Sequence, residues 1–322
     1  DDLGNYTVTN QASTQANITP KSLTLTAVSE SKVYDGTTAS SGTVIVSTMV
    51  SGDEVVTSQS FVSKDVMGPG GSTLQVNPAY TVQDGNGGKN YAVTTITATG
   101  TVTKAPLTVK ANDDARFVGL ADSANFAGVQ YDGWVGGDTS SVLGGTLLVK
   151  RSNVGTSAAG VYPGVLRPEG LTSNNYEIAY SSGQFTIVPA DHLLIRTAPQ
   201  EITYGTAPTY VTTAQYLKSD NTTIITLTGT GTGNDYTFSD GLGTTVRAVL
   251  KPYAGNTLAS LSSTDHTVVG NYAIKDLSPT VTGGNFVGAP VFVGNLSVNT
   301  KAVTPNATGV SKVYDGTTAM SN

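Results

Sequence analysis

The chain has 322 residues, of which 38% are hydrophobic and 12% charged, and its formal net charge is −6. This balance argues against disorder, and an acidic chain without clustered Lys and Arg is a poor partner for nucleic acid. No apolar run reaches the ~18 residues of a membrane-spanning helix, and the absence of cysteine excludes thiol catalysis and cysteine-ligated metal centres. Abundant Gly, Thr, Val and Tyr predict strands joined by tight turns, so we expect an all-β protein.

A recurring marker, Asn-Tyr-x-Val or Asn-Tyr-x-Ile, divides the chain into modules. Its tyrosines are Tyr6, Tyr91, Tyr176 and Tyr272, at spacings of 85, 85 and 96 residues. We interpret these tyrosines as architectural, because each shares a strand face with the aliphatic residue two positions later. A joint follows each marker, and its usual proline ends one strand and fixes the direction of the next. The predicted parts are the tail of a preceding module at 1–20, modules at 21–104, 105–188 and 189–300, and the start of another at 301–322.

The first module contains the sharpest local motif, Tyr34-Asp35-Gly36, within a nine-residue stretch at 31–39. Asp-Gly favours a tight turn, because Asp bonds its own backbone and Gly takes positive φ. We therefore interpret the motif as a structural turn rather than as a ligand site. Short alternating runs separated by turn residues predict a sandwich. The predicted strands are 43–48, 54–57, 59–62, 73–76, 91–95 and 99–103.

A glycine-rich loop near the end of the first module offers two oxygen-bearing side chains, Asp84 and Asn86. Calcium prefers six to eight oxygen ligands, and no acidic residue closes this loop at the spacing of a calcium site. We therefore expect no cofactor and no metal, and keep Ca²⁺ at Asp84 and Asn86 as a minor alternative.

The second module holds the only tryptophan, Trp134, three residues after Tyr131. An exposed tryptophan beside a tyrosine can stack on a sugar ring, whereas a buried pair packs the core or an edge. Burial is the favoured interpretation, and glycan contact through Tyr131 and Trp134 is kept as the alternative.

The third module has 112 residues, against 84 in each of the first two, and we expect the extra length to lie in loops. Its two histidines are far apart, and no Gly-x-Ser-x-Gly elbow accompanies them, so we predict no enzyme activity. After it, the nine residues at 31–39 recur letter for letter at 311–319. We expect the chain to be a piece of a longer tandem array. The second copy of the turn motif is Tyr314, Asp315 and Gly316.

The first module resembles the YDG repeat domain of large bacterial adhesins. The resemblance rests on residues 32–39, then Ser51-Gly52-Asp53, the marker at 90–93 and the closing run at 102–109. It implies a repeat domain of a Gram-negative, filamentous haemagglutinin-like exoprotein exported by two-partner secretion, with no catalytic residues.

The second module is similar to the companion MBG domain of the same adhesins. The similar segments are Tyr131-Asp132-Gly133 with Gly136-Gly137-Asp138, Asn153–Thr156, Gly160-Val161-Tyr162 and Asn175–Ile178. The third module, with Ile202–Pro208, resembles a longer and more divergent MBG domain.

Together these features predict tandem antiparallel β-sandwich modules arranged as an elongated rod, immunoglobulin-like in topology or, alternatively, β-grasp-like. We expect the stalk of a secreted or outer-membrane-associated adhesin that projects a binding tip for cell or biofilm-matrix attachment. Its partners would be neighbouring modules of the same chain. In the alternative, the modules themselves bind exopolysaccharide, host glycan or a host surface protein through exposed aromatics.

Overall fold

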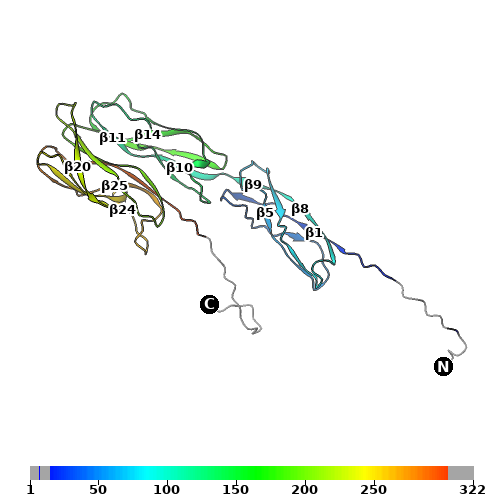
Figure 1. The fold of residues 1–322 in the computed structure, drawn as a ribbon. Helices are drawn as coiled ribbons and strands as arrows, with labels where there is room; N and C mark the ends of the chain where they lie inside the picture. Colours follow the sequence, from blue (N-terminus) through cyan, green and yellow to red (C-terminus); the bar gives the residue numbers. More distant parts are fainter. Residues whose placement is uncertain (1–6, 8–14, 304–322) are drawn as a thin grey trace. The chain divides into compact units, whose positions relative to one another are not determined.

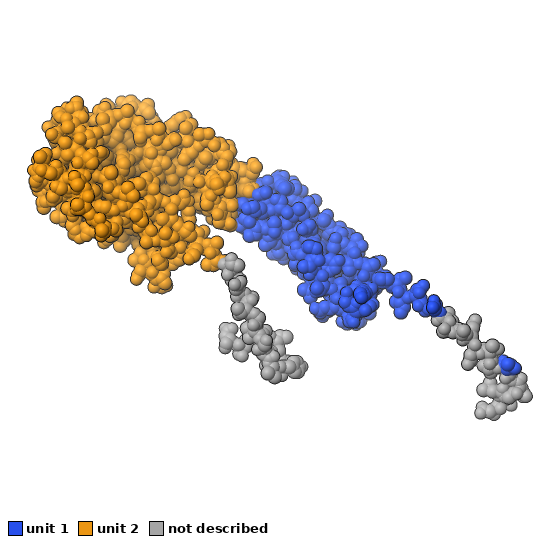
Figure 2. All heavy atoms as spheres, in the orientation of Figure 1, with its two compact units in different colours: residues 1–104 blue, residues 105–322 orange. Residues whose placement is uncertain are grey.

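Strands make up almost all the regular structure of the computed structural model, which describes residue 7 and residues 15–303. Two compact units, 1–104 and 105–322, are coloured separately in Figure 2. Within the described residues, the helical structure is a single 3₁₀ turn at Ser140–Val142. The predicted all-β class is therefore confirmed. The second turn motif, at Tyr314, Asp315 and Gly316, lies outside the described residues.

Unit 1 is a small sandwich (Figure 1). One sheet has the strand order β3-β1-β8, the other β2-β9-β6-β5, and β4 and β7 pair separately. Leu23, Leu25, Phe61 and Leu74 fill the space between the sheets and are at most 1% exposed. The strands are β1 (Lys21–Thr26), β2 (Ser31–Val33), β3 (Ile45–Val46), β4 (Glu54–Val56), β5 (Gln59–Phe61), β6 (Ser72–Val76), β7 (Thr81–Gln83), β8 (Tyr91–Ile96) and β9 (Ala98–Thr103).

The first and last strands of unit 1 run parallel along the whole module. β1 pairs with β8 in one sheet and β2 pairs with β9 in the other, both in parallel register. Between these pairs the Ala27 N–H donates to the Ile96 carbonyl at 2.9 Å, so the two strands change sheets together. The sheets are thus mixed, and the expectation of purely antiparallel sheets was wrong, because residue alternation specifies the buried face but not the direction of the neighbouring strand. The chain consequently enters this module at one end and leaves it at the other.

The first half of unit 2 repeats this arrangement with longer strands. Its sheets have the orders β12-β10-β15 and β11-β16-β14-β13. β10 is parallel to β15 and β11 is parallel to β16, which are the counterparts of the two parallel pairs in unit 1. The strands are β10 (Ala105–Ala111), β11 (Asp114–Phe117), β12 (Val129–Asp132), β13 (Gly144–Arg151), β14 (Gly160–Thr172), β15 (Tyr176–Ser181) and β16 (Gly183–Val188).

The second half of unit 2 keeps the two parallel pairs, β17 with β27 and β18 with β28, and enlarges one sheet. That sheet has the order β26-β22-β21-β20-β19-β17-β27, and the other is β18-β28-β25-β23-β24. The extra residues were expected in loops, but they form additional strands of the larger sheet. The strands are β17 (Leu193–Thr197), β18 (Gln200–Thr203), β19 (Thr212–Leu217), β20 (Ile224–Thr232), β21 (Asp235–Ser239), β22 (Thr245–Val249), β23 (Lys251–Ala254), β24 (Thr257–Leu258), β25 (Gly270–Lys275), β26 (Thr280–Thr282), β27 (Val291–Val293) and β28 (Asn295–Asn299).

The two halves of unit 2 lie side by side along a seam between β12 and the β25–β28 pair. Gln130 Nε2 donates to the Leu296 carbonyl at 3.0 Å, and Asn271 Nδ2 donates to the Tyr131 carbonyl at 3.0 Å. A shared apolar cluster adds to the seam. Its buried members are Ala115, Phe117, Val188, Leu194, Leu217 and Val293.

The side-by-side packing brings the end of unit 2 back toward its beginning. Thr300 lines the same groove as Gly133, and Gly133 lies so close to Pro106 that a Cβ on it would be 2.5 Å from the Pro106 carbonyl oxygen. An end-to-end rod therefore does not describe these two modules, because apolar and amide groups on their flanks are paired with each other.

Candidate functional site

The marker tyrosine of unit 1 ties together two loops and a strand. Tyr91 begins β8, and its hydroxyl donates to Asp53 Oδ2 at 2.7 Å and accepts from the Val50 N–H at 2.9 Å. Burial and the neighbouring Asp53 carboxylate raise the pKa of Tyr91, so the phenol remains a hydrogen-bond donor. The Tyr91 hydroxyl therefore has a structural role: it holds Val50 and Asp53 at the end of the module where the chain enters.

Tyr176 makes the same tie in unit 2. Its hydroxyl donates to Asp138 Oδ2 at 2.8 Å and accepts from the Val135 N–H at 3.2 Å. The separations in sequence are also those of unit 1, 38 residues to the carboxylate and 41 to the backbone donor. The Gly-Asp pairs Gly52-Asp53 and Gly137-Asp138 thus supply the carboxylate of each tie.

Tyr272 shares the marker sequence but not this position. It lies on β25, which is antiparallel to β28, and its hydroxyl donates to the carbonyl four residues earlier at 2.9 Å. Tyr162 on β14 makes the same bond at 2.8 Å. Each of these tyrosines follows a glycine by two residues, Gly160 or Gly270, at φ near +155° (156° and 154°). Tyr272 is therefore the counterpart of Tyr162 and not of Tyr176. The 96-residue spacing between Tyr176 and Tyr272 thus joins strands that are not equivalent.

The Tyr34-Asp35-Gly36 segment forms a turn closed by its own side chains. Tyr34 is buried, and Gly36 has a φ of 77°. Asp35 Oδ1 accepts from the Thr37 N–H and from Lys32 Nζ, both at 2.9 Å. Burial opposes ionisation of Asp35, but these bonds outweigh it and lower the pKa of the carboxyl. One carboxylate oxygen of Asp35 is thus engaged within the turn.

The glycine-rich loop uses its carboxylate in a similar way. Asp84 Oδ1 accepts from the N–H groups of Asn86 and Gly88, each at 2.8 Å, and Oδ2 accepts from the Asn90 N–H at 3.0 Å. The bond from Gly88 contributes most to the lowered pKa of Asp84. The Asn86 side-chain amide donates to Asn90 Oδ1 at 2.9 Å. Within the described ranges, no group of three or more His, Asp or Glu residues is placed to hold a metal ion, and calcium at this loop stays an untested prediction.

Tyr131 and Trp134 lie in a groove of about 280 Å³ along the seam of unit 2. The Trp134 ring is half-buried, with ring centroids 5.1 Å from Tyr131 and 5.3 Å from Tyr176. Its Nε1 is buried and has no hydrogen-bond partner among the described residues. Asp132 and Asn299 also line the groove and provide polar atoms beside the rings.

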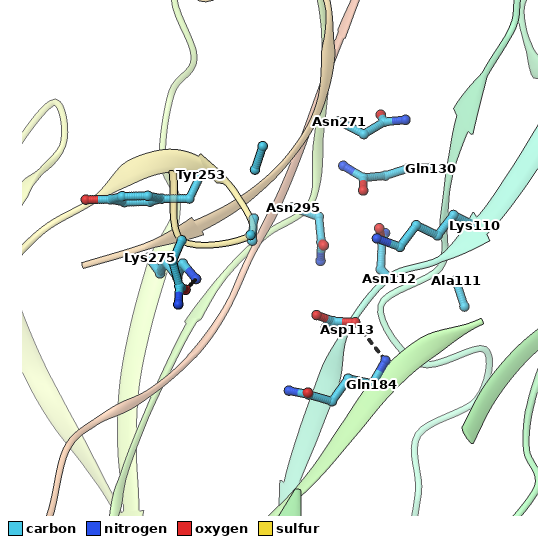
Figure 3. A pocket seen from close by; sticks show the side chains of 14 residues that line it. Lys110, Ala111, Asn112, Asp113, Gln130, Gln184, Tyr253, Asn271, Lys275 and Asn295 are labelled. Carbon is cyan, nitrogen blue, oxygen red and sulfur yellow. Dashed lines mark hydrogen bonds between the residues drawn. The ribbon is translucent and has the colours of Figure 1, made fainter. Parts of the chain in front are cut away.

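A second cavity on the same seam, of about 360 Å³, is lined mainly by amides (Figure 3). Asn112 and Asn295 belong to different halves of unit 2 and are 3% and 6% exposed. Asn112 Oδ1 and Asn295 Nδ2 are buried without a partner in the described part of the chain. Sequence patterns did not indicate this cavity, because its residues come from segments far apart and carry no motif. Its lining includes Lys110, Asn112, Asp113, Gln130, Gln184, Tyr253, Asn256, Asn271, Lys275 and Asn295.

Comparison with known families matches unit 1 and the first half of unit 2 to two domain types. Residues 19–98 match the YDG domain, and residues 107–186 match the MBG domain of the YGX type. The chain carries a YDG domain and an MBG domain. Both are repeat or binding-type domains and are not known catalytic families. No curated protein matches the chain.

These matches leave finer expectations untested. The division at 188 and 189, the MBG-like character of the third module and the link to two-partner secretion stay predictions. No helix in the described part of the chain is long and apolar enough to cross a membrane.

Proposed function

We propose that this chain belongs to the non-catalytic repeat region of a secreted or surface-attached bacterial adhesin, where the YDG domain bears load between the cell and a distal binding tip. The YDG and MBG matches support a repeat-type module. The observation that carries the proposal is the parallel pairing of the first and last strands in unit 1.

This pairing is suited to tension because of its direction. Force applied at the two ends of the module pulls β1 and β2 against β8 and β9 along their length. The backbone hydrogen bonds of both pairs are then loaded together, whereas a hairpin pulled at its open end breaks its bonds one after another. A shear arrangement therefore raises the barrier to forced unfolding, which is governed by the unfolding rate.

We assign unit 2 a role other than bearing load. Its two modules lie side by side, so they add less reach per residue than unit 1 does. Their paired flanks stiffen the region and leave the two grooves of the seam available to a ligand.

Single-molecule pulling of the full chain tests the load-bearing role. We expect Ala27→Pro to lower the unfolding force of unit 1 markedly, because it removes the N–H bonded to Ile96 between the two parallel pairs. Val76→Ala, in the core of β6 and outside the loaded pairs, is the control for a general loss of stability. Equal force changes in the two variants, once scaled to their equilibrium destabilisation, would contradict the proposal.

The groove at Trp134 supports a second candidate, direct binding of a glycan by unit 2. Its half-buried rings supply an apolar surface, and Asp132 and Asn299 supply polar groups beside it, the combination that sugar sites use. If unit 2 binds a glycan, we expect at least one member of a glycan library to quench or enhance the fluorescence of Trp134. A flat response throughout the library would remove this candidate.

A further inference from the structure

The glycine-rich loop between β7 and β8 contains the only Asn-Gly pair of the chain, Asn86-Gly87. Asparagine loses its side-chain amide most readily when glycine follows it, because glycine has no Cβ to hinder attack of its own backbone nitrogen on the preceding side chain. Both residues are exposed, so water and hydroxide reach them. The loop therefore presents a reactive amide on the surface of unit 1.

The hydrogen bonds of the loop leave the attacking nitrogen available. Asp84 Oδ1 accepts from the N–H groups of Asn86 and Gly88, each at 2.8 Å, and passes over the N–H of Gly87 between them. Among the described residues, the Gly87 N–H donates to no acceptor. A Cβ built on Gly87 would meet no atom within 4 Å, so the space around this residue is open as well.

The same hydrogen bonds make the loop sensitive to a change at Asn86. Its side-chain amide donates to Asn90 Oδ1 at 2.9 Å, and deamidation removes that donor. The Asn90 N–H donates to Asp84 Oδ2 at 3.0 Å, and the Asn90 carbonyl accepts from the N–H of Lys21, the first residue of β1, at 2.9 Å. A change at Asn86 thus reaches the strand with which the module begins.

We propose that Asn86 is a site of spontaneous deamidation, and that the isoaspartate it yields loosens this loop. The Gly87 nitrogen loses its proton to hydroxide and attacks Asn86 Cγ. The bond from Cγ to the side-chain nitrogen then breaks, and that nitrogen leaves as ammonia with a proton taken from water. Water opens the resulting succinimide ring at either carbonyl, which leaves isoaspartate or aspartate at this position.

The overall reaction consumes one water and releases one ammonia, with no change of oxidation state. In isoaspartate the main chain passes through the former side-chain carbons, which places one extra carbon between the two N–H groups that share Asp84 Oδ1. The new carboxylate also lies on the same short loop as Asp84, where like charges repel. Ammonia is lost to the solvent, so the modified form accumulates with the age of the chain. The inference does not depend on the load-bearing role of unit 1.

Peptide mapping by mass spectrometry tests the reaction on the full chain, incubated at neutral and at mildly alkaline pH. We expect the peptide that contains Asn86 to be the first to gain the mass of an acid in place of an amide, and to do so faster at the alkaline pH. Asn174 is exposed and is followed by Asn175 instead of glycine, so it is the internal control and should keep its amide longer. A synthetic peptide of residues 81–90 provides the rate without the fold.

Two variants test the chemistry of the step. Gly87→Ala should slow the reaction about tenfold, which corresponds to about 1.4 kcal/mol in the barrier, because the added Cβ hinders the attacking nitrogen. Asn86→Gln should stop it on the same timescale, because the longer side chain closes a larger and less favourable ring. An unchanged rate in Gly87→Ala would overturn the proposed attack.

The effect on the loop is measured by hydrogen exchange. The product carries one more negative charge, so anion exchange separates it from the unmodified chain. We expect the amides of Lys21 and Asn90 to exchange faster in the isoaspartate fraction, whereas the amide of Phe61, which donates to the Thr38 carbonyl in the other sheet, should keep its rate.

Three results would overturn the proposal. The first is a chain that keeps Asn86 while the synthetic peptide deamidates, which would mean that the folded loop protects the amide. The second is an earlier loss of the amide at Asn174 than at Asn86. The third is an isoaspartate fraction in which the Lys21 and Asn90 amides exchange as slowly as before, since the loop would then tolerate the change.

Discussion

The YDG domain and the MBG domain have the same strand frame but anchor their loops with different charged residues. Both pair their first and last strands in parallel, and both tie a marker tyrosine to an aspartate 38 residues earlier. Residues 1–104 contain no arginine, and Glu30 anchors a loop there, whereas the MBG domain uses the buried Arg151. The frame is thus common to both domains, while the polar anchors differ.

Arg151 illustrates how one buried charge organises a loop of the MBG domain. Its guanidinium donates to Asp122 Oδ2 at 2.8 Å and to the carbonyls of Asn153, Thr156 and Val154 at 3.1–3.2 Å. Arg116 donates to the other oxygen of Asp122 at 2.7 Å. Burial opposes ionisation of Asp122, but the two arginines outweigh it and lower the pKa of the carboxyl. The Asn-Val-Gly-Thr segment, seen in the sequence only as a motif, is therefore the loop that Arg151 holds.

The largest expected effect is the loss of this anchor. Arg151→Leu should lower the free energy of unfolding of unit 2 by about 3–4 kcal/mol, because it removes one of the two arginines from Asp122 and takes the Arg151 donors away from three carbonyls. Urea denaturation followed by Trp134 fluorescence reports this unit, since Trp134 is the only tryptophan. Arg167→Leu, at an exposed position of the same sheet, is the matched control and should change the value by less than about 0.5 kcal/mol. Comparable losses in the two variants would show that the buried network contributes little.

A smaller effect is expected from the tyrosine–aspartate tie that both domains share. Tyr91→Phe and Tyr176→Phe should each cost about 1–2 kcal/mol, because a backbone N–H and a carboxylate lose one partner. The two losses should be similar, and exchange of the Val50 and Val135 amide protons should accelerate in the respective variants. Tyr80→Phe, on the half-buried surface of unit 1, serves as the control. Protection of Val50 that survives Tyr91→Phe would refute the shared role of the tie.

Local chemistry explains what the sequence made predictable. Strand alternation and turn residues act over a few positions, so the all-β class and the sandwich layering follow from them. The bonds of Asp35 and Asp84 likewise span only two to six residues. Such contacts depend little on the rest of the fold, and residue spacing alone is enough to anticipate them.

The features that could not be predicted depend on distant pairings. Parallel strands and the sheet that β20–β22 enlarge are set by partners far along the chain, which alternation does not encode. Tyr272 carries the marker sequence on β25, which is not the counterpart of the strands that hold Tyr91 and Tyr176. The same four-residue pattern therefore occurs at two different positions of the fold. Asn112 and Asn295 line one cavity from the two halves of unit 2, and nothing in the sequence around either residue indicates the other.

Glu30, the carboxylate anchor of unit 1, provides the smallest and most specific test. Its Oε1 accepts from the Ser41 hydroxyl at 2.6 Å and its Oε2 accepts from the Gly42 N–H at 3.3 Å and from the Ser40 hydroxyl. Burial raises the pKa of Glu30, but these bonds outweigh it and lower the pKa from 4.5 to about 2.

A lowered pKa in the folded state means that the ionised group stabilises the fold above pH 4.5, and that this stabilisation is lost as the pH falls toward 2. Because solvent screens part of the interaction and glutamine retains an acceptor, we expect Glu30→Gln to cost about 1 kcal/mol at pH 7. The difference from the unmodified protein should shrink toward zero near pH 2. Hydrogen exchange of peptides from unit 1 measures it, with the exposed Glu54→Gln as the control. A cost that stays constant between pH 7 and pH 2 would show that Glu30 acts through packing rather than through its charge.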